Sequence, residues 1–243
     1  MFYSISEKKD MAVENKTFNG FKPYTYYKNS DLKVNNKDNK DVKKQQLKSV
    51  LGAAAGVGAA LVISKGIYKH DFFKEVPDDV LENSKDKLIN TGKEVASMLT
   101  MAGLSNIGAI IANYKTLTPE EKKTKWHEAG FQIMNTSIPM LLVTGVNLLC
   151  DKVKALNNKP AKIIASLAAM VTGAMIATKI TNANKKETEE KRKYTIKDSV
   201  ANFDDIVATI VVGFPQYKKL NTIAKYLLPP IYTYCGARAG VKE

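Results

Sequence analysis

Long uncharged blocks, separated by lysine-rich connections, constrain the fold of this 243-residue chain more than any other feature. The blocks from Val95 to Tyr114 and from Ala129 to Cys150 contain no Asp, Glu, Lys, Arg or His. One helical crossing of a bilayer needs about 20 mostly apolar residues. Both blocks reach this length, so the sequence predicts helices that span a membrane.

Two further uncharged runs are shorter. The runs from Ser49 to Ser64 and from Ile163 to Thr178 each contain 16 residues and are bounded by lysines. A lysine can lay its apolar stem along a helix and keep its ammonium group in water, which extends the reach of a short span. The predicted spans are therefore residues 49–66, 95–114, 129–150 and 162–180.

The C-terminal part predicts two helices of another kind. Over 196–214, apolar residues at helical spacing oppose a polar stripe that includes Asp205. Over 220–237, Lys225 is the only charge, and Pro229-Pro230 is expected to break the helix. This last segment suits a kinked span, a re-entrant hairpin or a packed surface element. The predicted fold class is all-α: a polytopic helical membrane bundle with about four spans and a C-terminal amphipathic or re-entrant region.

The first 48 residues differ from the rest of the chain. They are rich in Asn, Lys, Asp and Gln, with too little apolar surface to offset the entropy of ordering. We predict a flexible basic tail over 1–48 and a helical bundle domain over 49–243. Aromatic residues gather in the tail segment FNGFKPYTYY. They form a short docking motif for a protein partner, an interfacial anchor, or a disordered stretch that happens to hold aromatics.

The net charge of +13 favours an anionic partner, either acidic lipid or nucleic acid. Of the 37 basic residues, only Arg192 and Arg238 are arginines. Arginine supplies the bidentate fork that base and phosphate recognition favours. Its scarcity argues against a nucleic-acid reader and favours lysines that flank spans in a lipid bilayer.

The lysines also predict an orientation. The tail has 11 lysines against 6 acidic residues before the first block, which places the N-terminus in the cytoplasm by the positive-inside rule. An acidic excess in the next connection and the lysines of 115–125 agree with this orientation. The connection over 152–162 does not, because it is basic and would lie on the far side. We predict an integral, multi-pass membrane protein.

No catalytic motif is complete in this sequence. His127-Glu128 begins the zinc-protease pattern HExxH, but no second histidine follows. Cys150 and Cys235 lack the spacing of a metal site or a disulfide framework. We expect no catalytic residue, no cofactor and no metal, and hence no enzyme.

Polar residues in or beside the apolar blocks are the candidates for a functional site. Glu128, Gln132 and Asn135 share one helical face, and Asp205 lies in the polar stripe near the C-terminus. Such groups normally point into a bundle. There they line a path for an ion or small solute, or they simply hydrogen-bond a neighbouring helix.

Gly52 and Gly56 form a GxxxG pattern in the first uncharged run. Small residues at this spacing allow helix backbones to approach closely in a membrane. We predict that both glycines pack against another helix, and that a homo-oligomer through such small-residue faces is an open alternative.

Together these features predict an integral membrane protein with a non-enzymatic role in anchoring, organising or recruiting other components. The first alternative is a small-solute or ion transporter or channel that uses Glu128, Gln132, Asn135 and Asp205. The second alternative is a soluble helical-bundle interaction protein, because two of the four runs have only 16 residues.

Overall fold

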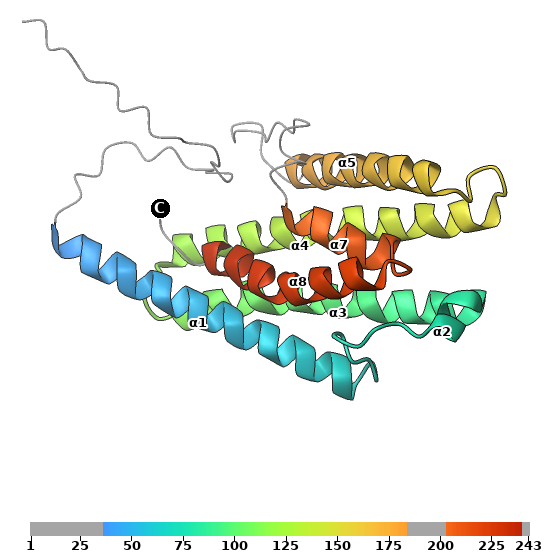
Figure 1. Ribbon diagram of the computed structural model, residues 1–243. Coiled ribbons are helices and arrows are strands. Elements are labelled where there is room, and N and C mark those ends of the chain that lie inside the picture. The colour runs from blue at the N-terminus through green and yellow to red at the C-terminus, as the bar shows by residue number, and fades with distance from the viewer. Residues whose placement is uncertain (1–35, 184–202, 240–243) are drawn as a thin grey trace, which may run out of the picture. The chain divides into compact units, whose positions relative to one another are not determined.

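The computed structural model describes residues 36–183 and 203–239, and every regular element in these ranges is a helix (Figure 1). The helices are α1 (Asn36–Gly66), α2 (Asp78–Glu82), α3 (Ser84–Asn113), α4 (Pro119–Lys152), α5 (Lys159–Ala183), α7 (Phe203–Gly213) and α8 (Lys218–Ala239). Four of them, α1, α3, α4 and α5, are long and apolar enough to cross a membrane. The predicted all-α class with about four candidate spans is confirmed.

The helices α3 and α4 begin in the charged segments that precede their apolar blocks, because these segments carry the capping residues. The side chain of Asn83 accepts hydrogen bonds from the amides of Lys85 and Asp86 and starts α3. Thr118 and Glu121 form a reciprocal capping box at the start of α4. In α3 and α4 the helix therefore starts several residues before its apolar block.

The helix α1 begins before the predicted end of the tail. It starts at Asn36, so residues 36–48 are helical, whereas 1–35 lie outside the described residues. Extending a helix costs much less than nucleating one, which allows polar residues to join it. The side-chain amide of Asn113 also donates to the Gln45 carbonyl (3.1 Å) and to Ser49 Oγ (2.7 Å). These bonds tie the extension to the end of α3.

The helices α1 and α3 pack along each other through small residues. Gly52 lies against Gly108, and Gly56 lies against the backbone of Leu104 and Ser105. A Cβ atom at either glycine of α1 would overlap the α3 backbone. The GxxxG face is therefore occupied within the chain, and the homo-oligomer stays a prediction.

The helices α4 and α5 form a second close pair. Pro139 lies inside the continuous helix α4, and Gly173 of α5 faces it. A Cβ atom at Gly173 would lie 2.7 Å from the Pro139 nitrogen. Further along the pair, Asn147 Nδ2 donates to Ser166 Oγ at 2.9 Å. The two helices thus run in opposite directions.

The C-terminal helices differ from the prediction for 220–237. The helix α8 is continuous through Pro229 and Pro230, so the expected break is absent. Each proline removes one backbone donor, but α8 packs along both α1 and α3, and this packing holds it in line. The preceding helix α7 lies within the predicted segment 196–214 and packs against α4 and α8.

The two ends of the bundle differ in what joins the helices. At one end, here called the basic end, α1 begins, α3 passes into α4, and α5 and α8 end (Figure 1). The opposite end, here called the loop end, carries the connections 67–77, 153–158 and 214–217 (Figure 1). In the sequence, lysine-rich segments lead into α1 (1–48), join α3 to α4 (115–125) and follow α5 (179–197).

Candidate functional site

Three titratable side chains meet in the interior near the loop end. Lys225 Nζ lies 2.5 Å from Glu94 Oε1, and His70 Nε2 lies 3.3 Å from Glu94 Oε2. The Lys225 side chain is 1% exposed and that of Glu94 is 3% exposed. We call His70, Glu94 and Lys225 the Glu94 cluster.

Each member of the Glu94 cluster comes from a different element. Glu94 lies in α3, one residue before the uncharged block, and Lys225 lies in α8. His70 follows the end of α1, where Lys69 adopts a left-handed backbone conformation (φ 49°) that turns the chain back. Ser64 Oγ then donates to the His70 carbonyl at 2.9 Å. The turn after α1 thus places the imidazole over α3.

The ammonium group of Lys225 has further contacts from the connection 67–77. It donates to the Lys74 carbonyl at 2.9 Å and lies 5.8 Å from the centre of the Phe72 ring. The Phe72 ring in turn meets His70 edge-on, with 6.5 Å between ring centres. Lys225 therefore joins α8, α3 and this connection in one site.

The energetics of the Glu94 cluster are those of a buried ion pair. Removing two charges from water costs several kcal/mol per ion, and close pairing with added hydrogen bonds offsets this cost. One carboxylate and one ammonium balance each other, and removal of either leaves a buried charge without its counter-charge. An ionisable group inside a helical membrane bundle is by default a candidate functional group.

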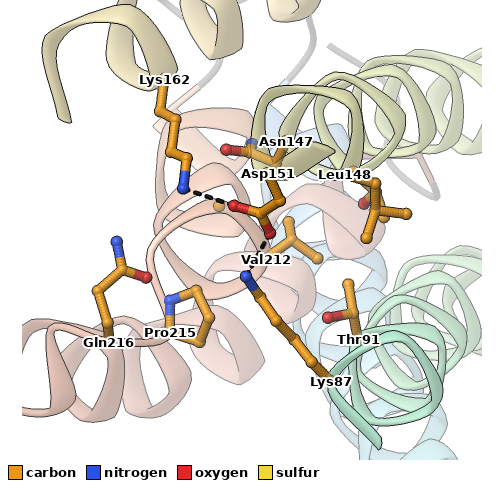
Figure 2. A pocket seen from close by; sticks show the side chains of 11 residues that line it. Lys87, Thr91, Asn147, Leu148, Asp151, Lys162, Val212, Pro215 and Gln216 are labelled. Carbon is orange, nitrogen blue, oxygen red and sulfur yellow. Dashed lines mark hydrogen bonds and ion pairs between the residues drawn. The ribbon is translucent and has the colours of Figure 1, made fainter. Parts of the chain in front are cut away.

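A second polar group lines a small cleft at the loop end. The Asp151 carboxylate binds the ammonium groups of both Lys87 and Lys162, which Figure 2 shows on either side of it. This three-residue bridge joins α3, α4 and α5. The cleft beside it has a volume of about 20 Å³. That is room for one or two water molecules.

The four polar positions that the sequence predicts as a functional site lie outside both the Glu94 cluster and the cleft. Gln132 and Asn135 are half-buried on α4, and Gln132 Oε1 is an enclosed atom with no hydrogen-bond partner among the described residues. Glu128 lies in α4 and Asp205 in α7, but their side chains lie outside the described part of the structure. None of these four positions belongs to the Glu94 cluster or to the residues that line the cleft.

The sequence gives a partial signal for the Glu94 cluster. Lys225 is the only charge in its apolar segment, and Glu94 directly precedes an uncharged block. Opposite charges isolated beside apolar helices are expected to pair. No spacing rule connects two residues so far apart in the chain, however, and the signal does not identify the partner.

The described residues contain no candidate metal site. No group of three or more His, Cys, Asp or Glu side chains in 36–183 and 203–239 is placed to hold a metal ion.

Comparisons with known proteins find no match: no protein-family model, no curated protein and no solved structure matches the chain.

Proposed function

We propose that this protein is an integral, multi-pass membrane protein with a non-enzymatic role, in which the bundle anchors the basic N-terminal segment at the membrane and recruits a partner there. The observation that supports membrane residence is the distribution of side chains: large apolar groups are exposed on the outer faces of the long helices, and polar groups bond to one another between these helices.

Large apolar side chains cover the outer faces of the long helices. In the most apolar 18-residue windows of α1, α3, α4 and α5, only 28–50% of the residues are buried. Val62 is 73% exposed, Ile111 is 63% exposed and Ile164 is 68% exposed. A monomeric soluble protein rarely exposes large continuous apolar surfaces, whereas a lipid-facing helix requires them.

Polar side chains lie between the same helices. Ser64 Oγ and Ser97 Oγ are 2.7 Å apart in the buried contact of α1 with α3. Asn147 and Ser166 are buried in the contact of α4 with α5. Serine and asparagine that bond across helices are typical of membrane bundles. This pattern favours a membrane protein over the soluble-bundle alternative.

The charge of the two ends supports a cytoplasmic basic end and thus a cytoplasmic N-terminus. In the sequence, lysine-rich segments lead into α1, join α3 to α4 and follow α5, the three places where the chain enters or leaves the basic end. At the loop end, Lys87 and Lys162 bind Asp151, and Lys218 binds Asp78. Of these three lysines, only Lys162 belongs to the basic connection over 152–162, so that connection still counts against this orientation.

An anchoring role agrees better with the described interior than transport does. The cleft at Asp151 holds only one or two water molecules, and the Glu94 cluster is closed by three elements. Recruitment would use the aromatic group of FNGFKPYTYY, because it lies in the lysine-rich segment that precedes α1 in the sequence.

Membrane residence is tested by extraction of cell membranes with high salt and then with alkaline carbonate. The protein is expected to stay in the pellet, and recovery mainly in the soluble fraction would contradict the proposal. Recruitment is tested by crosslinked pull-down with the full chain and with a deletion of residues 1–35, which spares α1.

A specific partner is expected to be lost on this deletion. As the matched variant, the five aromatics of the segment are replaced with serine at unchanged length: Phe18, Phe21, Tyr24, Tyr26 and Tyr27. Retention of the partner by both variants would contradict recruitment through this segment.

A further inference from the structure

The helix α8 follows the candidate spans along the bundle. It has 22 residues, and a helix of this length extends about 33 Å, close to the roughly 30 Å of a bilayer core. Lys225 lies opposite Glu94 and Gly236 lies against Ser105, so α8 runs in the same direction as α3. Ala237 packs with Ala53 of α1 and Ala109 of α3. The end of α8 therefore approaches the basic end.

Hydropathy alone leaves α8 out of the candidate spans. Two features of the sequence argue against α8 as a span, namely a charged residue and a pair of prolines, and the structure accommodates both. The Lys225 charge is paired with Glu94 and turned away from the outer surface. The pair Pro229-Pro230 leaves the helix continuous. What remains between Lys225 and Arg238 is uncharged.

Apolar side chains dominate both faces of α8, and the polar Asn221 and Lys225 are buried on its inner face. The inner face packs Ala224, Leu228 and Tyr232 into the main core. The outer face is exposed and consists of large apolar and aromatic side chains: Leu220, Ile223, Tyr226, Leu227 and Tyr234. A helix that is apolar on all sides is either fully buried or in contact with lipid. Since α8 is not covered on its outer face by the described residues, lipid is the occupant that fits.

The helix α7 delivers the chain to the start of α8. It has 11 residues, about 16 Å in length, and it leads into the turn 214–217 at the loop end. We propose that α8 crosses the bilayer from the loop end to the basic end, with its outer face against lipid acyl chains. This inference rests on the proposed membrane residence. It places the end of α8 on the same side of the membrane as the start of α1.

Single cysteines report this topology in the full chain. In a background with Cys150→Ala and Cys235→Ala, Gln216→Cys marks the turn before α8 and Lys242→Cys marks the segment after it. Thr116→Cys marks the basic end and Lys154→Cys marks the loop end. Two separate preparations of sealed vesicles, one right-side-out and one inside-out, are treated with a membrane-impermeant maleimide. Lys242→Cys is expected to react in the vesicle preparation in which Thr116→Cys reacts. Gln216→Cys is expected to react in the preparation in which Lys154→Cys reacts.

Reaction of Lys242→Cys and Gln216→Cys from the same side would overturn the inference. Protease protection of a C-terminal epitope tag on the otherwise unchanged chain repeats the test without cysteine substitutions. Digestion of the tag by protease added on the side of the membrane where the loop end lies would also overturn the inference. Release of the protein by carbonate would instead refute membrane residence itself. The two failures are therefore distinguishable.

Discussion

Replacement of Glu94 by Gln is expected to lower the free energy of unfolding by about 3–5 kcal/mol, because it leaves the Lys225 ammonium buried without a counter-charge. Lys225→Met is expected to cost a similar amount, since it leaves the buried Glu94 carboxylate without the ammonium group and with only His70 beside it. The measurement is a denaturant titration of the purified protein in detergent micelles, followed by helical circular dichroism.

The double variant Glu94→Gln with Lys225→Met is expected to be more stable than either single variant. An uncharged pair of similar volume often replaces a buried ion pair at little cost. The Gln side chain also leaves an acceptor for His70. The difference between the double variant and the sum of the singles measures the coupling.

An exposed ion pair on the same helix provides the control. Lys218 binds Asp78 at 2.7 Å near the start of α8. Asp78→Asn is expected to change the stability little, because both groups are in water. Additive losses in the double variant, or an equal effect of Asp78→Asn, would contradict the assignment of the Glu94 cluster as a buried pair.

The second large effect is expected at the contact of α1 with α3. Gly56→Ala places a methyl group where the Leu104 carbonyl of α3 lies, so the helices must separate. We expect a loss of about 1–3 kcal/mol in the free energy of unfolding from this overpacking. The same titration in detergent micelles measures it.

Gly58 is the matched control, two residues along the same helix. A Cβ atom there meets nothing within 4 Å, and the position is exposed. Gly58→Ala is expected to gain up to about 1 kcal/mol, because alanine favours a helix over glycine. The two substitutions therefore have opposite expected signs, and equal changes of the same sign would refute the close packing at Gly56.

The four candidate spans could be predicted because the information that identifies them is local. An uncharged run of sufficient length, such as 129–150, identifies a helix without any tertiary contact. The capping signal at Thr118 and Pro119 also lies in a few adjacent residues, and the structure contains this cap. The helix α1 begins at Asn36, within the predicted tail segment, because residues 36–48 join a helix that packing and Asn113 support from elsewhere in the chain.

The Glu94 cluster and the continuity of α8 through its two prolines could not be predicted, because they depend on contacts between residues that are distant in the sequence. Glu94 and Lys225 meet only when α8 lies along α3, and no local pattern fixes that placement. The pair Pro229-Pro230 argues for a break in isolation, whereas packing against α1 and α3 keeps the helix intact. Polarity at helical spacing selected Gln132 and Asn135, which lie outside the cluster.

The claim that the outward apolar faces contact lipid is tested most directly by fluorescence. Trp126 is the single tryptophan of the chain, so Trp126→Phe gives a background without tryptophan. Into it we place Leu167→Trp on the outer face of α5, or Lys154→Trp in an exposed connection as the control. In vesicles, Leu167→Trp is expected to be quenched by brominated acyl chains and shielded from acrylamide, with the reverse for Lys154→Trp. Equal acrylamide quenching of both, with no effect of the brominated lipid, would contradict a membrane-embedded bundle.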